Sequence, residues 1–71
     1  MSRPYHVLFA RESATDRWTL EFGDYDKSTV VYERQTYRDN DYKASNLKVI
    51  TSTSDKQACL NAIMARLNNE L

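Results

Sequence analysis

The sequence predicts an α+β fold, a small three-stranded sheet with two helices packed on one face, in the order β-β-α-β-α. Three short segments are rich in apolar, aromatic and β-branched residues, at 5–10, 17–22 and 47–53, and these predict strands. The C-terminal segment instead repeats apolar residues at helical spacing. Since 71 residues are the length of one domain, we expect a single domain spanning residues 1–71.

The first predicted strand, residues 5–10, carries apolar bulk on both faces, which suits a strand with neighbours on both sides. Residues 17–22 alternate, so Trp18, Leu20 and Phe22 share one face and are expected in the core. The first two strands should form an antiparallel hairpin. A right-handed crossover to the third strand then gives the order 2-1-3, with the first strand in the centre.

The first helix is predicted to run from an N-cap at Asp26 or Ser28 to about Arg38. Val30, Arg34 and Tyr37 fall on one of its faces, with Val31 beside them. A polar loop at 39–46 follows it.

The second helix is predicted from a capping box at its start. In such a box the Ser54 hydroxyl accepts a hydrogen bond from a free backbone amide of the first turn, and the Gln57 side chain reaches back toward Ser54. Behind it runs one apolar stripe of Leu60, Ile63, Met64, Leu67 and Leu71, extended by the small residues Ala58, Cys59 and Ala62.

Charge and composition exclude several classes of function. Ten basic and ten acidic residues give a net charge of zero, so no overall field attracts nucleic acid or a membrane surface. One cysteine and one histidine build neither an intrachain disulfide nor a tetrahedral zinc site. We therefore expect no metal and no cofactor, and stability that comes from the core or from a second subunit.

The sequence contains no apolar run near 18 residues and no export-signal pattern. It begins with Met1 and carries a free cysteine, which fits a reducing compartment. We expect a complete small protein of the cytoplasm, with no membrane association.

Residues 24–28 (DYDKS) are the one string with a chemical signature. They resemble the start of a calcium loop, but Thr29 stands where that loop needs glycine and Gln35 where it needs glutamate. They also resemble the aspartate pair of phosphoryl-transferring hydrolases, which require a much larger parallel sheet. The favoured interpretation is a turn leading into a helix N-terminus, where aspartate offsets the helix dipole.

No catalytic residues are predicted. His6 lies in the middle of a strand without a local nucleophile or carboxylate, and Cys59 belongs to the inner side of a helix. A single glycine excludes a glycine-rich phosphate loop. We therefore expect a protein that is not an enzyme.

Tyrosines and charged side chains are interleaved over residues 25–42, and tyrosine and arginine are enriched at protein interfaces. Acidic residues in the same segment would repel a phosphate backbone, so a protein surface is favoured over nucleic acid. The predicted partner-binding residues are Tyr25, Tyr32 and Tyr42 as anchors, with Arg34, Arg38, Asp24 and Asp26 fixing the register.

The spacing Trp18, Glu21-Phe22-Gly23-Asp24-Tyr25-Asp26, Val30, Glu33 and Tyr37, followed by a strand and a helix ending in Leu67-Asn68, resembles small accessory proteins of phages and prophages. That resemblance implies a product of a mobile element that acts in the cytoplasm of a bacterial host cell. Such a product would bind and block a host protein, including defence systems such as CRISPR effectors.

Three hypotheses about function follow. The first is a phage-type accessory protein that binds a host protein, with anti-CRISPR inhibition as one such action. The second is a nucleic-acid-binding accessory protein in which the arginines, Lys43 and Lys48 hold phosphates, so that its binding weakens with salt. The third is a homodimer that pairs through an open sheet face or edge.

Overall fold

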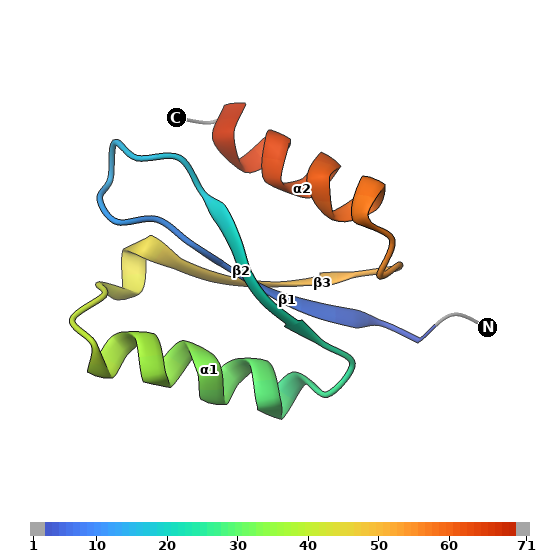
Figure 1. Ribbon diagram of the computed structural model, residues 1–71, viewed down its shortest axis with the longest axis horizontal. Helices are drawn as coiled ribbons and strands as arrows, with labels where there is room; N and C mark the ends of the chain where they lie inside the picture. The colour runs from blue at the N-terminus through green and yellow to red at the C-terminus, as the bar shows by residue number, and fades with distance from the viewer. Residues whose placement is uncertain (1–2, 70–71) are drawn as a thin grey trace.

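The computed structural model describes residues 3–69 and forms a sheet with one helix on either side (Figure 1). The α+β class and the predicted order of elements are confirmed. The elements are β1 (Tyr5–Ala10), β2 (Thr19–Asp24), α1 (Lys27–Asp39), a short 3₁₀ turn η1 (Ala44–Asn46), β3 (Leu47–Ser52) and α2 (Gln57–Asn69).

The strand order in the sheet is β2-β1-β3, with β1 antiparallel to both neighbours, as the sequence predicts. Val7, Leu8 and Phe9 of β1 are fully buried. A strand whose consecutive side chains are all apolar needs cover on both faces of the sheet, and the central position supplies neighbours on both sides as well.

The two helices lie on opposite faces of the sheet, so the expectation that both pack on one face is wrong (Figure 1). Val7 and Phe9 pack with residues of α2, whereas Leu8 packs on the other side with Val30 of α1. The physical reason lies in β1, because its alternating side chains send apolar bulk to both faces and each face must be covered.

A β-bulge in β2 corrects the predicted face of Phe22. Leu8 pairs with Phe22 and Phe9 pairs with Leu20, which leaves Glu21 as the extra residue. The bulge reverses the alternation, so Leu20 packs on the α2 side and Phe22 on the α1 side. Trp18 and Leu20 share a face as predicted, whereas Phe22 packs on the opposite face of the sheet, beneath α1.

The start of α2 also differs from the prediction. The helix begins at Gln57, and the Ser54 hydroxyl accepts a hydrogen bond from the amide of Lys56 at 3.1 Å. The Gln57 side chain donates to Asn61 along the helix at 2.8 Å. The Ser54 side chain therefore stabilises the turn that precedes the helix, and the predicted capping box does not form.

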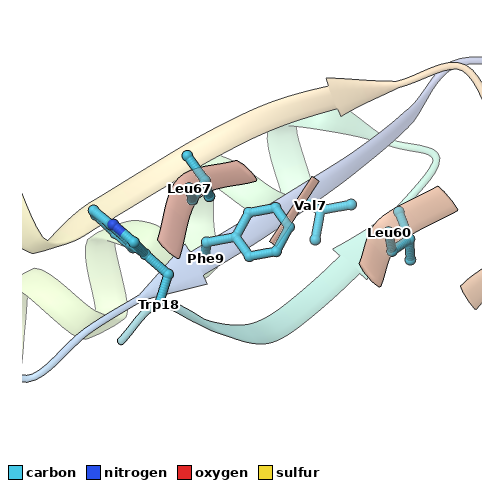
Figure 2. Close-up of a cluster of buried hydrophobic side chains, with 5 residues drawn as sticks. All are labelled: Val7, Phe9, Trp18, Leu60 and Leu67. Atoms are coloured by element: carbon cyan, nitrogen blue, oxygen red, sulfur yellow. The ribbon is translucent and has the colours of Figure 1, made fainter. Parts of the chain in front are cut away.

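The apolar stripe of α2 is narrower than predicted. Leu60 and Leu67 are buried against Val7 and Phe9 (Figure 2), with Ile63 and Met64 partly buried beside them, while Ala58 and Ala62 are exposed and Leu71 lies outside the described residues. Two buried leucines one heptad apart are what a helix resting on a narrow sheet requires.

Candidate functional site

The seven predicted partner-binding residues lie at three places along α1. Tyr25 and the two aspartates precede the helix, Tyr32 and the two arginines lie on it, and Tyr42 follows it. A helix of 13 residues is about 20 Å long, so the first and last of these groups lie at opposite ends of α1. The structure therefore separates the predicted anchors instead of gathering them into one patch.

Asp24 and Asp26 form the turn before α1. The Asp26 amide donates to the Asp24 carboxylate at 2.7 Å, and the Asp26 carboxylate accepts from the hydroxyl and the amide of Ser28 at 2.7 and 3.0 Å. Asp26 is thus the N-cap of α1, as predicted. The two bonds from Ser28, that of the hydroxyl first, hold the pKa of Asp26 below its usual value.

The N-cap makes stability depend on acid. Because the folded state lowers the pKa of Asp26, its contribution is present above the ordinary carboxyl pKa of about 4 and is lost as pH falls through the lower folded value. We expect Asp26→Ala to lower the melting temperature at pH 7. Asp26→Asn should keep the cap and flatten the loss of stability between pH 5 and pH 2.

Thermal melts of both variants, followed by circular dichroism across that pH range, test this expectation. An Asp26→Asn protein that loses as much stability in acid as the parent would contradict it.

Tyr25 belongs to a cluster that joins three segments. Its ring meets Tyr5 of β1 edge-on at 4.8 Å, and the Arg3 guanidinium lies 4.8 Å from the ring centre. Its hydroxyl donates to the carboxylate of Asp55, in the loop before α2, and this bond is the main reason that the pKa of Tyr25 is raised. The ring is 37% exposed and its polar end already has a partner within the chain.

Gly23 is the position that lets the Tyr5 ring of this cluster approach the backbone of β2 closely. A Cβ atom at Gly23 would stand 2.5 Å from the Tyr5 hydroxyl oxygen and 2.7 Å from the nearest ring carbon. An aromatic ring laid over a cross-strand glycine covers backbone that would otherwise be exposed.

We expect Gly23→Ala to destabilise the protein by about 1–3 kcal/mol, because the ring of Tyr5 must move and loses its packing. Tyr5→Leu removes the atoms that clash, so Gly23→Ala should cost clearly less in that background. Urea denaturation of the four proteins forms a double-mutant cycle. Additive effects of the two changes would show that the Tyr5 ring is not the reason why position 23 requires glycine.

Tyr42 and Arg38 close the C-terminal end of α1. The ring of Tyr42 is half-buried and meets Tyr37 edge-on at 5.1 Å, and Arg38 donates to the Tyr42 carbonyl at 3.1 Å. Tyr37 donates to Glu21 at 3.0 Å, and burial together with this bond raises the pKa of Tyr37 to about 12.

Tyr32 is the most accessible of the predicted anchors. It is 73% exposed on α1, and its neighbour Val31 is 46% exposed. We call Val31, Tyr32 and Gln35 the outer face of α1, since all three are exposed while Val30 and Tyr37 pack toward the sheet. Arg34 is half-buried at the border of this face.

Sequence reasoning placed Val31 beside the inner face. The signal that could have corrected this is the pair of adjacent valines, because only one of two consecutive helical residues can point squarely at the sheet.

Two other singled-out residues have local partners. The His6 ring nitrogen Nδ1 lies 2.9 Å from the Thr51 hydroxyl across the sheet, and the Cys59 sulfur lies 3.6 Å from the Ser52 hydroxyl. Within residues 3–69 there is no group of three His, Cys, Asp or Glu side chains placed to hold a metal ion. In the same range, neither helix has the length and apolar character that crossing a bilayer requires.

Comparison with protein-family models, with curated proteins and with solved structures finds no match to this chain.

Proposed function

We propose that this protein acts by binding another protein through the outer face of α1. The observation that carries the proposal is the exposure of Tyr32 and Val31 side by side on a helix whose opposite face is packed on the sheet. An exposed tyrosine beside an exposed aliphatic residue provides apolar area and a hydrogen-bonding group at little cost in side-chain entropy. Tyr32 is the anchor, and Arg34 and Arg38 lie farther round the helix, Arg34 half-buried and Arg38 exposed.

The remaining predicted residues shape this surface from its two ends. Asp24 and Asp26 hold the start of α1, Tyr25 ties that start to Asp55, and Tyr42 packs under its end. In this proposal their substitution weakens binding by displacing the helix.

The charge along α1 favours a protein over nucleic acid as the partner. Lys27 and Arg38 are exposed, and so is Asp39. A surface of mixed sign provides little of the phosphate neutralisation that nucleic-acid binding depends on. The resemblance to phage accessory proteins makes a bacterial host protein, in the cytoplasm, the proposed partner, with inhibition of a defence system of the anti-CRISPR type as the proposed action.

Site-specific photocrosslinking in bacterial cells tests the proposal. A photoreactive phenylalanine analogue replaces Tyr32 in one protein and Asn61, an exposed residue of α2, in the control. We expect one crosslinked host protein at position 32 that survives nuclease treatment and is absent at position 61. Crosslinks of equal yield at both positions, or crosslinks lost with nuclease, would overturn the proposal, the latter in favour of nucleic acid.

The identified partner then permits a measurement of affinity. Tyr32→Ala should weaken binding about tenfold or more, as expected of an aromatic anchor, while Asn61→Ala leaves it unchanged. Because Tyr32 is 73% exposed, its substitution should leave the melting temperature close to that of the parent.

A further inference from the structure

The edges of the sheet are the parts of it that the helices leave open. Figure 1, drawn down the shortest axis, shows the strands crossing in projection with α1 on one side and α2 on the other. The principal dimensions are 37, 27 and 13 Å, and the shortest is little more than the width of three strands spaced about 4.8 Å apart. The protein is thus a slab whose two broad sides are the sheet edges, flanked by the sides of the helices.

The two edges differ in how well they are protected from pairing. β2 is interrupted by the bulge at Glu21 and ends in Asp24, and bulges and charges of this kind discourage the addition of a strand. β3 has an unbroken register of six pairs with β1. It contains one charged residue, Lys48, and two half-buried aliphatic residues, Val49 and Ile50.

A groove with both apolar and polar lining residues adjoins the β3 edge. A cavity of about 430 Å³ lies between β3 and α2, and all of its lining residues belong to β3, the loop after it or α2. Ile50 of the strand and Ile63 and Leu67 of the helix provide its apolar walls. An added strand would therefore find main-chain hydrogen bonds at the edge and a place for one apolar side chain beside it.

We propose that the occupant of this edge is a second copy of the chain, joined through β3 in antiparallel pairing to give a continuous six-stranded sheet. A two-fold axis normal to the sheet keeps the α1 side and the α2 side of both copies aligned. With the axis at Ile50, this residue lies opposite Ile50 of the second copy, with Cβ atoms about 4.5–5.5 Å apart at the mouth of the groove.

The same register avoids a clash of charge, because Lys48 then lies opposite Ser52 of the second copy and not opposite another lysine. The broad side of the slab measures 37 by 27 Å, room enough for the roughly 800 Å² per subunit that a stable dimer buries. Dimerisation would also stabilise a chain of 71 residues, whose small core contributes little stability on its own. The dimer leaves the outer face of α1 free, so it is independent of the proposed function.

Sedimentation equilibrium of the full chain at micromolar concentration tests the proposal, with the expected mass twice that of the monomer. Ile50→Lys and Ile50→Glu should each be monomeric, because like charges then face one another across the axis. Mixing these two variants should restore a dimer. Thr19→Lys, an exposed position on β2, is the matched control and should remain dimeric.

Disulfide trapping keeps the test independent of the folding of the charged variants. In a Cys59→Ser background, Ile50→Cys should crosslink to itself under mild oxidation, whereas Val49→Cys and Thr19→Cys should not. A parent protein that stays monomeric to several hundred micromolar, or one that crosslinks at 49 or 19 in preference to 50, would overturn the proposal.

Discussion

Phe9→Ala is expected to leave little folded protein at 25 °C. Phe9 is fully buried in the central strand, between Trp18 and the leucines of α2 (Figure 2). Replacing a buried phenylalanine with alanine costs about 3–5 kcal/mol. A domain of this size is stabilised by only about 5 kcal/mol, because a short chain buries a smaller fraction of its surface than a larger domain does. Circular dichroism during urea denaturation should show a midpoint shifted close to zero denaturant.

Leu8→Ala is the informative companion of Phe9→Ala. Leu8 is equally buried but faces α1, so its truncation should cost about 2–5 kcal/mol. Had both helices shared one face, one of the two residues would be exposed and its truncation nearly neutral. Thr53→Ala, at an exposed position directly after β3, is the control and should stay within about 0.5 kcal/mol of the parent. A nearly neutral Leu8→Ala would contradict the two-sided sheet.

Trp18→Ala should have an effect of similar size, about 3–5 kcal/mol. The indole is 3% exposed and is covered by two cations, with the Arg11 guanidinium 4.5 Å and the Lys48 ammonium 5.3 Å from its ring. Truncation would uncover Phe9 and remove both cation–π contacts. Trp18→Phe should recover more than half of the lost stability, because it restores most of the apolar area.

The backbone of Trp18 also contacts α2, through the side chain of Asn68. Its amide donates to the side-chain oxygen of Asn68 at 2.6 Å, and the side-chain amide of Asn68 donates back to the Trp18 carbonyl at 3.3 Å. Asn68→Ala should cost about 1–3 kcal/mol, since it leaves a part-buried amide without its partner. This variant keeps the tryptophan, so fluorescence can follow its unfolding, and Asn69→Ala is the exposed control. Equal stability of the Asn68 and Asn69 variants would show that the pairing contributes nothing.

Much of the fold could be predicted from local pattern. The bounds of β1 and the cap of α1 at Asp26 follow from residues that decide their own conformation, namely a run of strand-forming side chains and a carboxylate before a helix. The bulge at Glu21 could not be predicted, because the alternation from Trp18 to Phe22 is unbroken in the sequence and only the pairing with β1 shows the extra residue.

The residues of β1 alone could have predicted that both faces of the sheet are covered. Leu8 and Phe9 point to opposite faces of any strand, so two buried layers follow once both residues are taken as core. The capping box failed for a different reason. Ser54 hydrogen-bonds to the amide of Lys56, within the turn, and this local bond is as available to serine as the helical one.

The residues of the candidate site were predicted from their residue types. The tertiary contacts, which place them at different positions along α1, could not be predicted in the same way. Tyr25 meets Asp55 across 30 residues of sequence, and Tyr42 packs on Tyr37 at the far end of α1. Contacts of this range leave no trace in composition. Tyr32 could be predicted as exposed, since the helical period places it away from Val30 and Tyr37.

The position of α2 in the chain has a consequence for synthesis. Every element that builds the α1 side of the sheet precedes β3 or is β3 itself, so that side can close before α2 has been made. Until α2 arrives, Val7, Phe9 and Trp18 form an apolar surface exposed to the cell, on a sheet with an open edge. The nascent chain is thus most prone to aggregate between the synthesis of β3 and that of α2, and this period ends when α2 packs on the sheet through Leu60 and Leu67 and Asn68 bonds to Trp18.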